Sequence, residues 1–375
     1  MRIRRVMVSL VAVTLLAGCT AQQGELAPVP PQSAPTESLD PASVGPVTPV
    51  GTPSVVASGL SAPWSMVRLA SGSTLISERD SALVKELTAE GELREVGIVP
   101  GVQPHGEGGL LGLEVAEDGG SWLYAYFTAA SDNRIMRFAL EGSAGRYSLG
   151  AGKEILTGLA KAGNHNGGRI KVGPDGALYV TVGDAGDPAR AQDPTSLNGK
   201  ILRIDLDGNV PADNPIAGSA VYSMGHRNPQ GIAWDRDRRL WAAEFGQNTW
   251  DELNLIEAGG NYGWPIVEGS GTDAAYINPV AQWPTNEASP SGLTWTRDTF
   301  FMAALRGERV WAIYPGGESS STVAWFVGEF GRIRDVIPGP DGSLWFMTNN
   351  TDGRGDPSSD DDKIFQIALS PLVEG

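Results

Sequence analysis

A short repeated motif constrains the fold of this chain more than any other feature of its sequence. "GPDGALYVTVGD" at residues 173–184 recurs as "GPDGSLWFMTNN" at residues 339–350. Each copy combines a tight Asp/Gly turn with a short strand of alternating apolar residues. Looser copies lie at residues 70–79, 117–127, 235–246 and 296–311. Six such units, spaced roughly 45 to 60 residues apart, have the period of β-propeller blades.

The repeat count therefore predicts an all-β fold, a six-bladed β-propeller over residues 54–375. The 49 glycines and 26 prolines of the chain favour many turns and short strands over long helices. Propellers bind ligands in the central channel, where the loops above the inner strands converge. Functional residues are therefore expected in the segments that lead into the strands.

The residues before the propeller are predicted to have a separate role. Residues 1–19 combine a basic start with an apolar run too short to span a bilayer, which is typical of a signal peptide. They end in "LAGC", which resembles the bacterial lipobox and implies lipidation of Cys19; the alternative is a secretory signal with a chance cysteine. Residues 20–53 are rich in Pro, Ser and Ala and are expected to form a tether. We therefore expect an extracytoplasmic protein that a lipid on Cys19 anchors to the cell membrane.

The net charge of the chain limits its possible partners, and its cysteine content limits its possible disulfides. A formal net charge of −16 argues against a nucleic-acid partner, which requires a basic surface. An acidic surface favours solubility, and its oxygens can also hold calcium. Because Cys19 is the only cysteine, we expect no intramolecular disulfide in the mature chain.

Four polar clusters precede or begin apolar strands at the predicted blades. They are "HGEGGLLGL" (105–113), "NHNGGRI" (164–170), "GHRNPQGIAW" (225–234) and "GRIRDVI" (331–337). A solvated loop is the usual interpretation of one such cluster. Four of them in step with the blades indicate a shared binding site at one end of the propeller.

These segments, together with "DELNLIEAGGNYGWP" at 251–265, resemble the soluble quinoprotein sugar dehydrogenases. This is the glucose/sorbosone dehydrogenase family, and the likeness is greatest to its aldose sugar dehydrogenases, over about residues 55 to 370. The resemblance implies a six-bladed propeller that oxidises aldose sugars at the anomeric carbon to lactones. It also implies hydride transfer to pyrroloquinoline quinone (PQQ), followed by transfer to an acceptor that the sequence does not identify.

Sugar oxidation requires a base for the hydroxyl proton, and His165 suits this role because neutral imidazole is basic near neutral pH. The resemblance identifies His165 as the catalytic base; a structural turn histidine is the alternative. Asn164, an expected cofactor contact, stands where the family often has Asp, and an amide does not raise the imidazole pKa as an anion does. Gly167 and Gly168 are expected to let the backbone approach the cofactor closely.

Hydride transfer requires a cofactor, and the three carboxylates of PQQ suit the planar donor fork of arginine. Arg332 and Arg334 alternate along one predicted strand, so both are expected on one face. The resemblance implies that Arg227 has a catalytic role as well, because developing charge on the quinone oxygens needs donors. It implies the further cofactor contacts Asn228, Gln230, Arg306 and Glu107. Glu107 replaces a glutamine found in some relatives, and a carboxylate facing a tri-anion is unfavourable unless it is protonated or turned aside.

The resemblance also implies calcium. One ion would be held by the backbone carbonyls of Gly246 and Gln247 and would polarise the reactive carbonyl. A second, structural ion would be held by Glu252 and the carbonyl of Tyr262. Taken alone, the acidic residues of "DELN" are more typical of surface charge.

Two other functions compete with this interpretation. A calcium-dependent sugar lactonase also uses a six-bladed propeller, but it needs a metal-bound carboxylate site rather than paired arginines. A cofactor-free extracellular binding propeller is the stronger alternative. The combination of His165, Arg227, Arg332 and Arg334 favours the enzyme.

Overall fold

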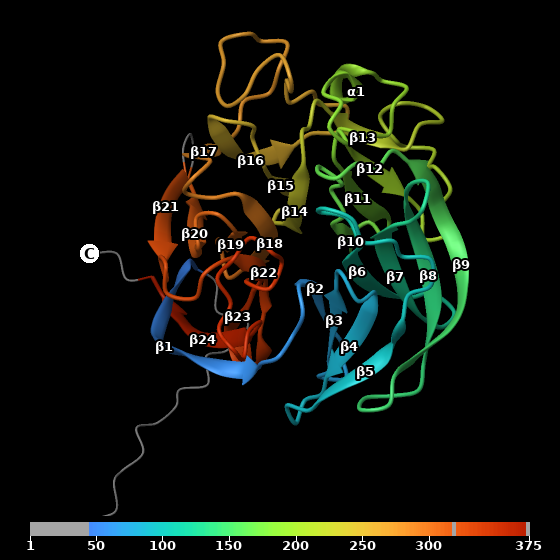
Figure 1. Cartoon of the computed structure of the whole chain (residues 1–375). Helices are drawn as coiled ribbons and strands as arrows, with labels where there is room; N and C mark the ends of the chain where they lie inside the picture. Colours follow the sequence, from blue (N-terminus) through green and yellow to red (C-terminus); the bar gives the residue numbers. More distant parts are fainter. Residues whose placement is uncertain (1–44, 317–319, 373–375) are drawn as a thin grey trace, which may run out of the picture. The chain divides into compact units, whose positions relative to one another are not determined.

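The computed structural model describes residues 45–316 and 320–372, whose regular structure is nearly all strand (Figure 1). The predicted signal peptide, Cys19 and most of the predicted tether lie outside the described residues. The strands form six antiparallel sheets of four strands each, so the predicted six-bladed β-propeller is confirmed. Within the described part of the chain, no helix is long and apolar enough to cross a membrane.

The blades follow one another along the chain. Blades 1 and 2 consist of β2 (Pro63–Arg68), β3 (Thr74–Glu78), β4 (Leu83–Leu87) and β5 (Leu93–Ile98), then β6 (Leu110–Glu117), β7 (Ser121–Thr128), β8 (Asn133–Glu141) and β9 (Ser148–Leu159). Blades 3 and 4 consist of β10 (Ile170–Val172), β11 (Leu178–Val182), β12 (Lys200–Ile204) and β13 (Val221–Met224), then β14 (Pro229–Trp234), β15 (Leu240–Glu244), β16 (Trp250–Ile256) and β17 (Ala281–Pro284). Blade 5 consists of β18 (Pro290–Thr296), β19 (Thr299–Ala304), β20 (Arg309–Pro315) and β21 (Ser320–Trp325). The one α-helix of the described residues, α1 (Ala189–Gln192), lies between β11 and β12.

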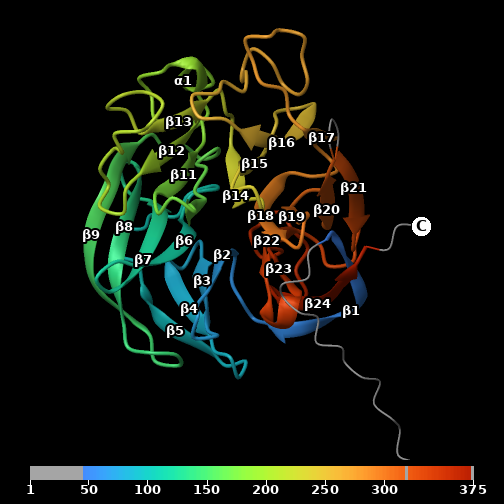
Figure 2. The same cartoon turned by 180° about the vertical axis from the view of Figure 1, so that it is seen from behind.

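Blade 6 combines the two ends of the propeller. It consists of β22 (Ile333–Pro338), β23 (Leu344–Thr348), β24 (Ile364–Pro371) and the N-terminal strand β1 (Val47–Ala57), which pairs antiparallel with β24 (Figures 1 and 2). The propeller therefore begins before the predicted boundary at residues 53 and 54, which falls inside β1. Only three of the 11 residues of β1 are buried and the strand contains Gly51 and Pro53, so this edge strand has the composition of a linker.

The repeated motif supplies the turn and the second strand of a blade. In "GPDGALYVTVGD" the Asp/Gly turn leads into β11, and in "GPDGSLWFMTNN" it leads into β23. Both strands are buried at every residue, and they supply Val180 and Phe346 to the hydrophobic clusters between blades. The alternating apolar pattern is therefore the signature of the propeller core.

The first strands of the blades contact one another around the ring, from β14 through β18, β22, β2 and β6 to β10. The four polar clusters of the sequence lie at or just before the starts of β6, β10, β14 and β22. Because equivalent strands begin at the same end of a propeller, the fold gathers these clusters around one mouth of the central channel.

Gly112 marks a close backbone contact between blades 2 and 3, where its N–H donates to the carbonyl of Gly168 at 3.1 Å. A Cβ at residue 112 would lie 2.2 Å from that oxygen, so Gly112→Ala forces the two backbones apart. We expect a loss of about 1–3 kcal/mol in the free energy of unfolding, seen as a lower midpoint in thermal melts. Gly120→Ala is the matched control. A Cβ at residue 120 would have Trp122 Nε1 at 3.6 Å as its nearest neighbour, which is an ordinary van der Waals contact. Equal melting temperatures for the two variants would contradict this account of the contact.

Candidate active site

A cavity of about 280 Å³ opens where the polar clusters meet. Ten of the predicted site residues line it: Glu107, His165, Arg227, Asn228, Gln230, Gly246, Gln247, Arg306, Arg332 and Arg334. Three predicted residues do not. Asn164 is exposed outside the cavity, while Glu252 and Tyr262 line a smaller cavity behind it.

His165 is held by a carboxylate that is far from it in sequence. Its Nδ1 lies 2.7 Å from Oδ1 of Asp184, whose side chain is fully buried. Asp184 also accepts hydrogen bonds from the backbone N–H of Gly186 at 2.8 Å and from Nε1 of Trp264 at 2.9 Å. Burial opposes ionisation of Asp184, but these hydrogen bonds outweigh it and lower the pKa of this carboxyl group. An ionised Asp184 fixes the proton of His165 on Nδ1, which leaves Nε2 to act as a base.

The two glycines after His165 are required by packing. Neither lines the cavity. A Cβ at Gly167 would lie 2.5 Å from the carbonyl of Thr181, and one at Gly168 would lie 2.7 Å from the side chain of Leu111. The pair is needed because the turn that carries His165 packs directly against neighbouring strands.

Arg227 is oriented by backbone carbonyls. Its Nη1 donates to the carbonyls of Phe245 at 3.3 Å and Gly246 at 2.5 Å, and its guanidinium lies 5.5 Å from the ring centre of Trp264. The Gly246 carbonyl, a predicted calcium ligand, is thus engaged by a cation. Within the described residues, no group of three His, Cys, Asp or Glu side chains is arranged to hold a metal ion.

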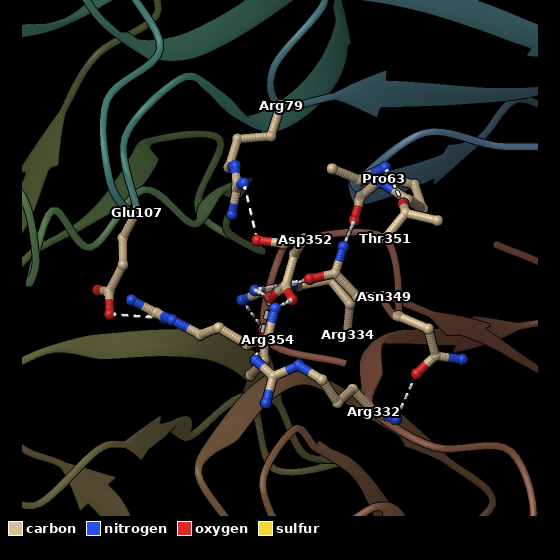
Figure 3. Close-up of polar contacts among 12 residues, drawn as sticks. Pro63, Arg79, Glu107, Arg332, Arg334, Asn349, Thr351, Asp352 and Arg354 are labelled. Atoms are coloured by element: carbon tan, nitrogen blue, oxygen red, sulfur yellow. Dashed lines mark hydrogen bonds and ion pairs between the residues drawn. The ribbon is translucent and has the colours of Figure 1, made fainter. Parts of the chain in front are cut away.

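Arg332 and Arg334 lie side by side in the cavity wall, as the alternation of the sequence predicted (Figure 3). Both are more than 90% buried. Nε and Nη2 of Arg334 donate to Oδ1 of Asn349, and Nη1 donates to Gln230 at 3.0 Å. Nε of Arg332 is buried and has no hydrogen-bond partner in the described structure. Burial lowers the pKa of Arg334 to about 9, so the group is still protonated at neutral pH.

Glu107 forms its ion pair with Arg354 and not with Arg332 or Arg334. Its Oε1 accepts a hydrogen bond from Nη1 of Arg354 at 3.0 Å (Figure 3). Its Oε2 accepts one from the backbone N–H of His165 at 3.1 Å. The ion pair with Arg354 neutralises the carboxylate that seemed unfavourable beside a tri-anion. Six arginines line the cavity against only two acidic residues: Arg79, Arg227, Arg306, Arg332, Arg334 and Arg354 against Glu107 and Asp251.

The smaller cavity behind the site is rich in carboxylates. Glu244, Glu252 and Glu268 line it together with Tyr262. Burial and the neighbouring Glu244 raise the pKa of Glu252 to about 7, because the buried acids repel one another as anions. A cation in this cavity would relieve that repulsion.

The model of the family described as "Glucose / Sorbosone dehydrogenase" matches residues 60–356. The chain belongs to this family. Membership makes it an oxidoreductase of the sugar dehydrogenase class and confirms the predicted resemblance.

Relatives of this glucose/sorbosone dehydrogenase agree with the assignment. Aldose sugar dehydrogenase YliI of Escherichia coli is 30% identical over 333 residues, which are 78% of this chain and 88% of that protein. Quinoprotein glucose dehydrogenase B of Acinetobacter calcoaceticus is 33% identical over 259 residues, which are 59% of this chain and 54% of that protein. The PQQ-bound structure of aldose sugar dehydrogenase from Streptomyces coelicolor superposes with a TM-score of 0.81 at 47% identity, covering 86% of this chain and all of that one.

Sequence reasoning missed Asp184, Arg79, Arg354 and Asp352 as members of the site. A signal for Asp184 was present, because it ends the motif "GPDGALYVTVGD" where the other close copy has Asn350. The two additional arginines lie outside the four polar clusters, and nothing in their local sequence marks them. They join the site only through contacts between blades.

Proposed function

We propose that this protein is a PQQ-dependent quinoprotein that oxidises aldose sugars at the anomeric carbon to lactones. The observation that carries the proposal is the pairing of His165 with buried Asp184 in a cavity lined by six arginines. A base and an anion-binding wall are the two elements that such an oxidation requires of the protein. Neither a binding propeller nor a lactonase requires this combination.

The residues of the cavity fit the cofactor. Arg227 and Arg306 form no ion pair with a carboxylate in the described part of the chain, and Nε of Arg332 is an unused buried donor. Buried donors without partners are costly, and a polycarboxylate would satisfy them. We propose that Arg306, Arg332 and Arg334 hold the carboxylates of PQQ, while Arg227 and Asn228 face its quinone oxygens. When bound, PQQ supplies the acceptor for the hydride that leaves the anomeric carbon.

The proposed mechanism assigns proton transfer to His165. Nε2 removes the proton of the anomeric hydroxyl while the C–H bond of that carbon breaks with its electron pair, which leaves a lactone carbonyl. Asp184 keeps the imidazole oriented and stabilises the imidazolium that forms. Arg227 stabilises negative charge that develops opposite the base.

The two predicted calcium positions differ in how well they fit. The Gly246 carbonyl accepts a hydrogen bond from Arg227, so the described arrangement does not fit a cation there, and we assign no step to one. The cavity of Glu252 and Tyr262 has the donor type that calcium prefers, because three carboxylates line it, but as described they are not gathered around one point. We therefore keep Glu252 and Tyr262 as proposed ligands of a structural calcium ion.

Reconstitution tests the proposed function. Apo-protein is loaded with PQQ in calcium-containing buffer, and reduction of an artificial electron-acceptor dye is followed with a panel of aldoses. Methyl glycosides of the same sugars are the matched control, because they lack the free anomeric hydroxyl. We expect dye reduction with aldoses alone. Hydrolysis of sugar lactones without PQQ, in the absence of dye reduction, would instead support the lactonase.

Membrane anchoring is a separate proposal that rests on the lipobox-like "LAGC". Cys19→Ala removes the thiol that would be lipidated, so we expect the variant to be released from the membrane or to remain unprocessed. Fractionation of cells that express each form measures the change. An unaltered membrane fraction for the variant would count against lipidation.

A further inference from the structure

The loop that follows β23 organises the arginines of the cavity wall (Figure 3). Asn349 accepts hydrogen bonds from Arg334 and donates to the carbonyl of Pro63 at 2.9 Å. Oδ1 of Asn350 accepts a hydrogen bond from the backbone N–H of Arg332 at 2.9 Å. Successive side chains of this loop thus contact Arg332 and Arg334, the pair of arginines that we call the clamp.

Asp352 has the central position in this loop. Its Oδ2 lies 3.0 Å from Nη2 of Arg332 and 3.8 Å from Nη2 of Arg334, and its Oδ1 accepts a hydrogen bond from the backbone N–H of Arg354 at 2.9 Å. Nη2 of Arg79 approaches its backbone carbonyl at 3.4 Å. Among the described residues, Asp352 is the only carboxylate that pairs with Arg332 or Arg334.

The carboxylate of Asp352 contacts the two arginines of the clamp but does not line the cavity. Its side chain is fully buried, and the residue does not line the cavity. Hydrogen bonds and ion pairs to Arg332 and Arg334 leave it ionised, and its pKa is lowered although burial opposes this. Two buried guanidiniums repel each other, and an anion shared between them lowers this repulsion and holds both in place.

We propose that Asp352 is a positioning residue for cofactor binding, which fixes Arg332 and Arg334 in the arrangement that receives the carboxylates of PQQ. The inference rests on the proposed function, because PQQ is the ligand that the clamp is proposed to hold. Asp352 itself makes no contact with the cofactor in this account and acts through the two arginines.

The direction in which PQQ affinity changes when Asp352 is removed distinguishes a positioning role from a purely electrostatic one. Removing a negative charge near an anion site strengthens anion binding if the arginines stay in place. If Asp352 positions the arginines, its loss instead weakens binding, because the guanidiniums lose the partner that orders them. The two roles therefore predict opposite changes in affinity.

The test is the dissociation constant of PQQ, measured by calorimetric titration of apo-protein at fixed salt. We expect Asp352→Ala to weaken binding about 10- to 100-fold, similar to Arg332→Ala, which removes one charged hydrogen-bond donor. Asp352→Asn keeps an acceptor oxygen and the side-chain volume, so its loss should be smaller than that of Asp352→Ala. Asp356→Asn is the matched control, because Asp356 is an exposed aspartate of the same segment, and it should stay within about twofold of wild type.

Thermal melts of the apo-proteins accompany the titration, so that a folding defect is recognised; if Asp352→Ala does not fold, Asp352→Asn decides. In an Arg332→Ala background, Asp352→Ala should weaken PQQ binding less than it does in wild type, because one of the two arginines that Asp352 positions is already absent. Wild-type or tighter PQQ binding by a folded Asp352 variant would overturn the positioning role while leaving the proposed function intact. Failure of the wild-type protein itself to bind PQQ would remove the proposed function and this inference with it.

Discussion

His165→Ala is expected to lower the turnover of the PQQ-loaded protein by about 10²–10⁴-fold, the usual contribution of a positioned general base. The imidazole is held by Asp184 at 2.7 Å, and no other histidine lines the cavity. PQQ affinity should change little, because His165 is not one of the arginines proposed to hold the cofactor, whereas the melting temperature should fall because buried Asp184 loses its partner. The measurement is kcat at saturating aldose with full cofactor occupancy.

His105→Ala provides the control for this substitution. His105 is exposed and lies in the neighbouring loop, where only its backbone makes hydrogen bonds in the described structure. Its variant should keep kcat within about twofold of wild type. If the His165→Ala enzyme keeps more than about a tenth of wild-type turnover, the loss is too small for a missing base, and His165 is not the base.

Asp184→Asn is expected to lower kcat by about 10²–10⁴-fold while sugar binding changes less. Asparagine fills the same volume but removes the anion that stabilises the imidazolium. Its amide also presents an N–H toward Nδ1, which favours the imidazole tautomer with the proton on Nε2 and so blocks the base. The variant loses the charge that accepts hydrogen bonds from Gly186 and Trp264, so about 1–3 kcal/mol of stability should be lost as well.

Asp187→Asn is the matched control for Asp184→Asn. Asp187 belongs to the same loop, but its side chain is 51% exposed and pairs only with Arg190. In steady-state kinetics of the PQQ-loaded variants, kcat of Asp187→Asn should therefore exceed kcat of Asp184→Asn by at least about 100-fold. Equal kcat values would show that Asp184 does not orient the base.

The fold was predictable because the propeller repeats one local pattern. The turn and alternating strand of "GPDGALYVTVGD" occur again in "GPDGSLWFMTNN", and both became the turn and the buried second strand of a blade. The start of β1 was not predictable in the same way. This outer strand buries few side chains, so its sequence carries almost no periodic signal.

Much of the candidate site was predictable because its residues belong to segments that the fold places at one mouth of the channel. The partners of those residues were not predictable from local sequence. Asp184 lies 19 residues from His165, and Arg354 lies 247 residues from Glu107. Such pairs depend on how the blades close into a ring, so the local sequence does not show that Glu107 pairs with Arg354.

The central claim is that this sugar dehydrogenase uses PQQ to oxidise aldoses, and an anaerobic titration tests it most directly. Apo-protein is titrated with PQQ while the absorption spectrum is recorded, and an aldose is then added without any electron acceptor. We predict saturable binding of PQQ, followed by loss of the oxidised cofactor spectrum on addition of sugar and formation of an equal amount of lactone. A protein that does not bind PQQ, or that binds it with no spectral change on addition of any aldose, would contradict the account.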